Sequence, residues 1–243
     1  MLHYVVPFFN NETTLEGNVR AFHAVLSRDF PGAFELVLCD DGSTDGSPAA
    51  AGRLAAELPA VRVTGYRANR GRGYAVRSAA ATCAGGRLVF SDLDLPQTTD
   101  LGLIRGLVRA LESHAVVVGS RFLGASATRR LRVRGLVGRV HRLFVRLLLP
   151  GLDVRDPDAG FKGFDLAVLA RLSAVCREDR WSWDMEVLAA ARSNGLSVME
   201  IPIDWNERHD AYATSVRIVR DGWEELTGML RIRRRWRAGD YRF

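Results

Sequence analysis

Lysine is nearly absent from this chain. Lys162 is the only one, so almost all of the positive charge is carried by arginine. Cysteine is also scarce, and Cys39, Cys83 and Cys176 do not have the spacing of a metal-ligand set. The sequence contains no run of eighteen apolar residues and does not start with a basic stretch leading into an apolar one. We therefore expect a reduced, cytoplasmic protein without a signal peptide or a membrane-spanning helix.

The composition is that of a globular chain with a sizeable core. Of the 243 residues, 47% are hydrophobic and 26% are charged, which favours one large domain over two. The net charge of +6 does not by itself indicate a nucleic-acid partner. No helix-turn-helix pattern, zinc-ligand set or aromatic RNA-binding signature accompanies it. We expect a single domain over residues 1–243 that does not bind nucleic acid.

Short apolar runs alternate with helical patterns along the chain. The strand candidates are residues 4–6, 35–38, 61–63, 88–90 and 115–118. Strands that alternate with helices form a mostly parallel sheet, so the pattern predicts an α/β, Rossmann-like fold with helices on the sheet. After the first strand we expect a helix that begins with a capping box of Thr13 and Glu16. The apolar face of that helix would comprise Leu15, Val19, Phe22, Val25 and Leu26.

Polar loops follow four of the strand candidates, at residues 10–12, 40–45, 69–73 and 92–94. In open α/β sheets, ligands bind beyond the carboxyl ends of the strands, so these four loops predict one shared binding site. Many different ligands bind at this position in such folds. The convergence therefore gives the location of a site and not its chemistry.

Asp92 and Asp94 are the most informative pair in the sequence. They lie one residue apart, directly after an apolar strand candidate. Mg²⁺ and Mn²⁺ prefer oxygen ligands and often bind one or two carboxylates together with substrate phosphate oxygens. A solvated turn is the alternative interpretation of such a pair. The neighbouring loops favour a metal site that holds the diphosphate of a nucleotide sugar.

The motifs taken together resemble glycosyltransferase family 2, whose members have the GT-A fold. They are residues 5–12, 40–45, 69–75, 92–94, 119–121 and 160–162, in the order that the family has. Residues 183–186, 200–205 and 215–216 resemble the closing motifs of the polyprenyl-phosphate branch, most of all the dolichyl-phosphate glucosyltransferases. The resemblance implies a nucleotide-sugar half over about residues 1–122 and an acceptor half over about residues 123–243.

The resemblance implies a donor site for a UDP-hexose rather than GDP-mannose. Its candidate residues are Pro7, Phe8, Asn10, Glu12, Asp41, Asn69, Arg72, Gly73, Asp92 and Leu93. Asp92 and Asp94 would bind Mg²⁺ or Mn²⁺. The metal would act as a Lewis acid on the leaving diphosphate, so we expect the loss of Asp94 to reduce activity most. The family usually has lysine where this chain has Arg72, and the positive charge is kept.

The acceptor implied by the resemblance is a polyprenyl phosphate, which receives the sugar with inversion. A phosphomonoester is largely dianionic at pH 7, so it requires cations more than a general base. The expected phosphate-binding residues are Arg121, Lys162, Arg208 and Ser215, with Arg121 and Lys162 also taking part in catalysis.

Asp158 departs from the family pattern and leaves a second acceptor open. A carboxylate beside Lys162 would repel a phosphate unless a cation balances its charge. It would instead suit a general base, and Asp158 is for that reason a further catalytic candidate. The alternative function is therefore transfer to a hydroxyl group of a soluble molecule such as a secondary metabolite.

Two basic segments carry apolar residues among their arginines. Residues 129–146 contain seven arginines and no acid, and residues 231–243 add a second cluster. A basic amphipathic helix can lie in the interface of an anionic membrane, so we expect peripheral contact with the cytoplasmic face of a membrane. The alternative is that the apolar residues of both segments pack on the sheet.

Overall fold

The structure is a computed structural model of the 243-residue chain, and it describes residues 1–123, 128–129, 141–206 and 218–243. The elements are β1 (Leu2–Phe8), α1 (Leu15–Asp29), β2 (Phe34–Asp41), α2 (Ser47–Glu57), β3 (Val61–Tyr66), α3 (Arg72–Ala80), β4 (Arg87–Ser91), α4 (Leu95–Thr98), α5 (Leu103–Ala110), β5 (Val116–Ser120), β6 (Thr128–Arg129), β7 (Phe161–Asp165), α7 (Leu166–Val175), α8 (Trp183–Ser193), β8 (Val198–Pro202), β9 (Trp205–Asn206) and α9 (Ile218–Ala238). Residues 141–148 form a further helix.

One sheet of seven strands organises the molecule, in the order β3-β2-β1-β4-β7-β5-β8. Only β7 is antiparallel to its neighbours in this sheet, β4 and β5. The other neighbouring strands are parallel, so the mostly parallel α/β fold expected from the sequence is confirmed. Strands β6 and β9 form a separate parallel pair.

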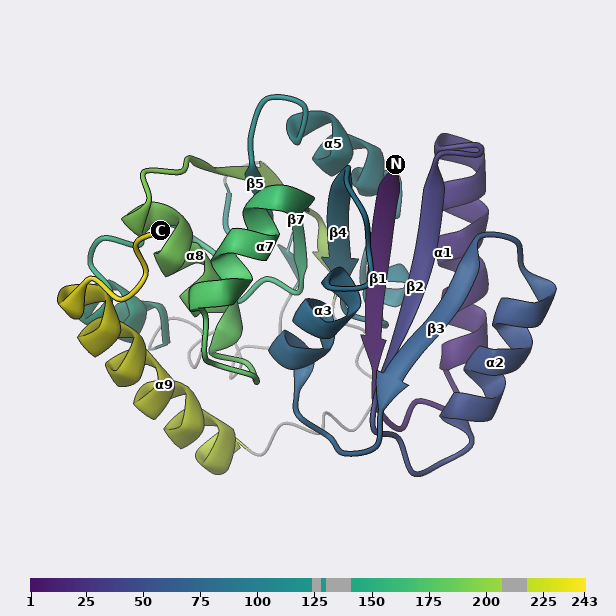
Figure 1. Cartoon of the computed structure of the whole chain (residues 1–243), viewed down its shortest axis with the longest axis horizontal. Helices are drawn as coiled ribbons and strands as arrows, with labels where there is room; N and C mark the ends of the chain where they lie inside the picture. Colours follow the sequence, from purple (N-terminus) through teal and green to yellow (C-terminus); the bar gives the residue numbers. More distant parts are fainter. Residues whose placement is uncertain (124–127, 130–140, 207–217) are drawn as a thin grey trace.

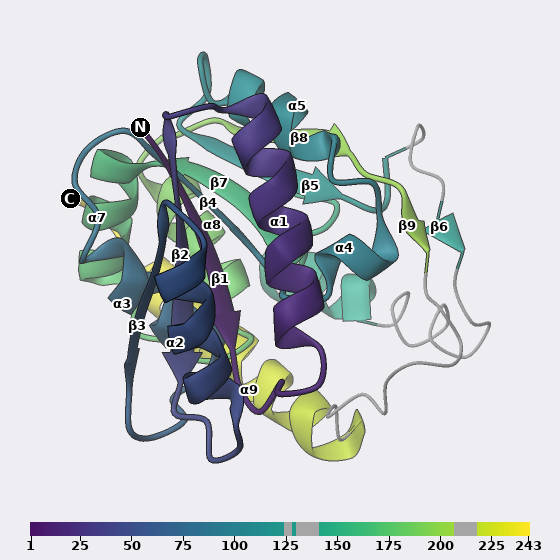
Figure 2. The ribbon, with the colours of Figure 1, turned by 90° about the vertical axis from the view of Figure 1, so that its right-hand side faces the viewer.

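Helices cover both faces of the sheet, which makes three layers. Helices α1, α2 and α5 pack on one face, and α3, α7, α8 and α9 pack on the other (Figures 1 and 2). Neighbouring strand residues therefore enter opposite cores, as Tyr4 and Val6 do on one face and Val5 on the other. Because both faces are buried, the strands consist of continuous apolar runs rather than alternating ones.

The five strand candidates correspond to β1, β2, β3, β4 and β5. Strand β7 is not evident from its sequence, because Lys162 interrupts the apolar pattern that marks a buried strand. The expected capping box at Thr13 is wrong. Helix α1 begins at Leu15, its N-cap is Thr14 without a side-chain hydrogen bond, and Glu16 pairs with Arg20 one turn further on.

The apolar face predicted for α1 is confirmed, with Leu15, Val19, Phe22 and Leu26 fully buried. In the described part of the chain, no helix has both the length and the apolar character needed to cross a bilayer.

An aromatic cluster joins α8 to the centre of the sheet. The indole of Trp183 lies 5.6 Å from the ring of Phe90 and 6.5 Å from the ring of Phe164, measured between centroids. All three side chains are completely buried. A Cβ at Gly73 would lie 2.3 Å from the Cβ of Trp183, so α3 approaches α8 too closely for any other residue there.

We expect Phe164→Ala to lower the free energy of unfolding by about 3–5 kcal/mol, because it leaves a cavity in this cluster. Urea denaturation followed by tryptophan fluorescence measures the loss. The matched control is Leu230→Ala at a half-exposed position of α9, for which we expect a change within about 0.5 kcal/mol. Equal losses in the two variants would contradict the assignment of Phe164 to the core.

Candidate active site

Two loops at the carboxyl ends of β1 and β2 are joined by hydrogen bonds. The backbone N–H of Asn10 donates to Ser43 Oγ at 3.0 Å, and Asn10 Oδ1 accepts from the backbone N–H of Thr44 at 2.8 Å. A carboxylate oxygen of Glu12 accepts from the backbone N–H of Gly46 at 3.2 Å. Asn10 has a positive φ of 52°, a conformation that asparagine tolerates better than most residues. These hydrogen bonds hold together the two loops at the edge of the sheet where the sequence predicts nucleotide binding.

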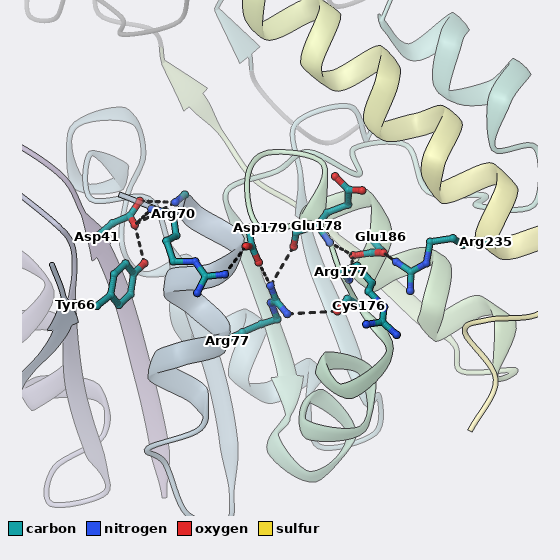
Figure 3. Close-up of polar contacts among 11 residues, drawn as sticks. Asp41, Tyr66, Arg70, Arg77, Cys176, Arg177, Glu178, Asp179, Glu186 and Arg235 are labelled. Atoms are coloured by element: carbon teal, nitrogen blue, oxygen red, sulfur yellow. Dashed lines mark hydrogen bonds and ion pairs between the residues drawn. The ribbon is translucent and has the colours of Figure 1, made fainter. Parts of the chain in front are cut away.

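Asp41 orders the third loop of this edge. Its carboxylate accepts hydrogen bonds from the hydroxyl of Tyr66 at 2.7 Å, the side-chain amide of Asn69 at 2.9 Å and the backbone N–H groups of Arg70 and Gly71 at 2.7–3.1 Å (Figure 3). Asp41 is buried. Its observed role is to hold the loop at 69–71 in place, and its contact with uracil or ribose stays a prediction.

A glycine is required where this loop passes β2. Gly42 has a φ of +75°, and a Cβ there would lie 2.7 Å from backbone atoms of Ala68 and Asn69. Both the left-handed conformation and the close approach exclude a side chain.

Arg72 links the aspartate pair to the interior of the protein. One guanidinium nitrogen donates to both carboxylate oxygens of Asp92, at 2.7 and 2.9 Å, and the other donates to Asp184. The second oxygen of Asp184 accepts from Lys162 Nζ at 2.6 Å. Lys162 and Asp184 are completely buried, and burial lowers the pKa of the Lys162 ammonium while Asp184 opposes that shift. Four charges thus form one continuous chain from β7 to the end of β4.

Asp94 lies beside these four charged residues and, unlike Lys162 and Asp184, is exposed. Its own backbone N–H donates a hydrogen bond to its carboxylate. Removal of water by the surrounding protein, followed by the charge of Asp92, raises the pKa of Asp94 to about 6. A carboxylate that is open on one side and repelled by its neighbour fits a place for a divalent cation. The two aspartates therefore match the ligand chemistry of Mg²⁺ or Mn²⁺.

Gly160 is a functional position that the sequence did not indicate by itself. A Cβ there would lie 1.8 Å from a carboxylate oxygen of Asp92 and 2.9 Å from Arg72, so only glycine leaves room for this pair. The backbone N–H of Asp92 also donates to the carbonyl of Gly160 at 2.9 Å. Gly160 belongs to the motif at residues 160–162 that resembles the family. Its contact with Asp92, however, joins segments that lie far apart in the sequence.

Arg121 and Asp156 form a second buried pair. The guanidinium donates two hydrogen bonds of 2.7 Å to the carboxylate, and the backbone N–H of Arg121 donates a third of 2.8 Å. The backbone N–H groups of Arg155 and Asp156 donate to Glu200 at 3.1–3.2 Å. Arg121 is thereby held at the carboxyl end of β5 with its charge balanced.

Asp158 meets two residues that the sequence did not indicate. His141 Nδ1 lies 3.3 Å from the Asp158 carboxylate, and His141 Nε2 lies 3.3 Å from that of Glu225 in α9. Burial is the main cause of the raised pKa of Asp158, and burial together with Asp158 raises the pKa of Glu225 to about 7. No local motif marks His141 or Glu225, because the three come together only in the folded chain.

The remaining candidates fall into two groups. Phe8, Leu93 and Gly73 lie inside the protein, so only their backbone groups can contact a nucleotide, while Pro7 is half-buried beside them. Arg208 and Ser215 lie outside the described residues.

A row of polar contacts continues from Asp41 toward α9. Asp179 pairs with both Arg70 and Arg77, and Glu186 accepts from the backbone N–H groups of Arg177 and Glu178 at 2.7 Å (Figure 3). The other oxygen of Glu186 pairs with Arg235 and accepts from the Tyr241 hydroxyl. Glu186 therefore anchors the end of α9 and has a structural role.

The comparisons with known proteins agree with a fold of the GT-A type. The model of the family described as "Glycosyl transferase family 2" matches residues 4–172. The chain belongs to this family.

Curated relatives cover nearly the whole chain. Glycosyltransferase AglD of Haloferax volcanii is 34% identical over 244 residues, which span 95% of this chain and 38% of that protein. Dolichyl-phosphate beta-glucosyltransferase ALG5A of Trichomonas vaginalis is 27% identical over 85% of this chain and 66% of its own length. The chain thus spans about four-tenths and about two-thirds of these two relatives.

Solved structures share the fold. Glucosyl-3-phosphoglycerate synthase from Mycobacterium tuberculosis in complex with UDP has a TM-score of 0.71 at 20% identity, over 96% of this chain and 80% of that one. The same enzyme with Mn²⁺, UDP-glucose and phosphoglyceric acid has a TM-score of 0.70 at 20% identity, over 96% and 79%. These similarities confirm the GT-A fold.

We expect Asp156→Asn to lower the free energy of unfolding by roughly 3 kcal/mol at neutral pH, because the guanidinium of Arg121 would lose two charge-assisted hydrogen bonds to a buried carboxylate. Burial acts to raise the pKa of Asp156, but the hydrogen bonds and charge of Arg121, together with the charge of Lys162, hold that pKa below its ordinary value of 3.8. A carboxyl group with a lowered pKa stabilises the fold above its unfolded pKa, and this contribution is lost as the pH falls through the folded pKa. The difference between the wild type and the variant should therefore shrink below about pH 4. Urea denaturation across this pH range measures it, and a difference that grows toward acid would contradict the pairing.

Proposed function

We propose that the chain transfers a hexose, with inversion, from a UDP-sugar to a polyprenyl phosphate, with Mg²⁺ or Mn²⁺ as cofactor. The observation that carries this proposal is the pair of Asp92 and Asp94 at the carboxyl end of β4, with the Arg72 guanidinium on Asp92. Carboxylates for a metal and a guanidinium for phosphate oxygens are placed next to each other there. A metal-bound diphosphate needs both.

The nucleotide-sugar half, about residues 1–122, would contribute the binding surface. The loops at 10–12, 40–45 and 69–71 follow β1, β2 and β3 and are fixed to one another. Their backbone groups and the oxygens of Asp41 would face the uracil and the ribose. Asp92 and Asp94 would hold the metal, which supplies positive charge to the leaving diphosphate.

Arg72 has a further role in this account. Its guanidinium is buried between Asp92 and Asp184, so its position is fixed before any ligand arrives. When a cation neutralises Asp92, the bidentate pair weakens, and the same guanidinium can donate to a phosphate oxygen. Asp184 keeps the arginine in place during this change.

The acceptor assignment is supported by the names of the relatives that match this chain, several of which are dolichyl-phosphate beta-glucosyltransferases. A dianionic phosphate needs no general base. Arg121 at the end of β5 would be the direct contact for the acceptor phosphate, whereas Lys162 of β7 is completely buried and would act through Asp184 and Arg72.

A transfer assay tests the function directly. The chain is incubated with Mn²⁺ or Mg²⁺, radiolabelled UDP-glucose or GDP-mannose, and a polyprenyl phosphate. We expect metal-dependent labelling of the lipid from the UDP-sugar, and at least a 100-fold loss in Asp94→Asn. The matched control is Asp100→Asn, which removes a nearby exposed carboxylate outside the site and should leave the rate unchanged. Metal-dependent hydrolysis of the UDP-sugar without labelled lipid would favour the soluble acceptor, and no use of any nucleotide sugar would contradict the proposal.

Peripheral membrane contact is part of the proposal. Leu143 and Leu147 lie one turn apart on the helix 141–148, with 56% and 60% of their surfaces exposed, and Arg146 lies beside them. Trp223 of α9 is also exposed, at 69%. Exposed apolar side chains next to arginine fit the interface of an anionic bilayer. Most of the basic segment at 129–146 lies outside the described residues.

We expect the chain to sediment with vesicles that contain phosphatidylglycerol, less so as the salt concentration rises. The double variant Leu143→Ser and Leu147→Ser should bind at least about 10-fold more weakly, because two exposed leucines leave the interface. Met199→Ser, which alters an exposed apolar residue on the edge strand β8, serves as the control and should bind normally. Equal binding by both variants would show that this helix does not contact the membrane.

A further inference from the structure

Three side chains of types that commonly bind metals come from separate segments of the chain and lie close together. His141 lies in the helical segment 141–148, Asp158 precedes β7, and Glu225 belongs to α9. One ligand atom of each lies within 4.8 Å of those of the other two. The imidazole stands between the two carboxylates, at 3.3 Å from each.

The polar atoms of this group are incompletely satisfied. Asp158 Oδ1 and His141 Nε2 are buried from solvent and have no hydrogen-bond partner within the usual limits. A buried carboxylate oxygen without a donor is unfavourable by roughly 1–3 kcal/mol or more. Asp158 and Glu225 also contact the same imidazole, so two carboxylates lie close to each other here. A bound cation would satisfy the free oxygen and offset the repulsion between the two carboxylates.

The neighbouring cations are already engaged. Lys162 pairs with Asp184, and Arg72 pairs with Asp184 and Asp92. Among the residues that the structure describes, no lysine or arginine donates a hydrogen bond to Asp158 or Glu225. Lys162 and Arg72 therefore act on these carboxylates from a distance, and the imidazole is the basic group in direct contact with both.

A second group of potential metal ligands differs from this one because an arginine already contacts it. His3, Glu35 and Cys83 also lie within 4.8 Å of one another. There, however, Arg62 donates to Glu35 at 2.7 Å and to the Cys83 sulfur at 3.3 Å, so a cation is already present. This second group requires no metal.

We propose that His141, Asp158 and Glu225 bind one divalent transition-metal ion, separate from the ion at Asp92 and Asp94. A nitrogen and two carboxylate ligands suit Zn²⁺ or Mn²⁺ and leave a coordination position open for water or an anion. The imidazole would turn one nitrogen to the metal while both carboxylates move closer to it. On the basis of the proposed function, an anionic acceptor would bind next to this ion, which also offsets the repulsion by Asp158.

Zinc counting tests the site without any assay of activity. The whole chain is dialysed against Zn²⁺ and then against metal-free buffer at neutral pH, and the zinc held per chain is measured by atomic emission. We expect one zinc ion in the wild type, and at least a 10-fold weaker affinity in His141→Asn and in Glu225→Gln. Cys83→Ser, in the second group, should retain the zinc, as should Asp94→Asn.

Circular dichroism and thermal unfolding of each variant show that it is folded. Zinc retained in folded His141→Asn and Glu225→Gln would overturn the proposal, as would a wild type that holds no zinc after dialysis. Zinc lost in Asp94→Asn but kept in His141→Asn would place the ion at the aspartate pair and would equally overturn it. These outcomes are independent of whether the chain uses a UDP-sugar.

Discussion

The buried carboxylate of Asp184 is the interaction on which the site depends. It accepts from Lys162 on one side and from Arg72 on the other, and so it joins β7, α3 and α8. Each of these charges alone would cost several kcal/mol to bury, and they are compatible with the core only as a set. Loss of Asp184 would leave buried Lys162 without a carboxylate partner and would leave Arg72 with Asp92 as its remaining one.

This arrangement joins elements that lie far apart in the sequence. Arg72 belongs to α3, whereas Lys162 belongs to β7 and Asp184 to α8. The charges that build the framework are paired, as are Arg121 with Asp156 and Arg235 with Glu186. The charges that would receive a ligand are of a different kind, because Asp94 is open and Asp158 faces a histidine.

The sequence predicted the part of the fold that local patterns determine. Continuous apolar runs located β1 to β5, and the polar residues after them located the site edge, including Asp92 and Asp94. The sequence did not predict strand β7, because the charge of Lys162 is neutralised by Asp184, 22 positions away in the sequence. The sequence also did not indicate His141 or Glu225, or the close approach of Gly160 to Asp92. Each of these features depends on contacts between segments that lie far apart in the sequence.

A crystal structure of the chain with Mn²⁺ and UDP tests the central claim most directly, because manganese can be located by its anomalous scattering. The account predicts a manganese ion coordinated by Asp94 and by diphosphate oxygens, with Arg72 still held by Asp184 and now donating to the diphosphate. A diphosphate bound away from Asp92 and Asp94, or Arg72 still closed on Asp92 beside bound UDP, would contradict it.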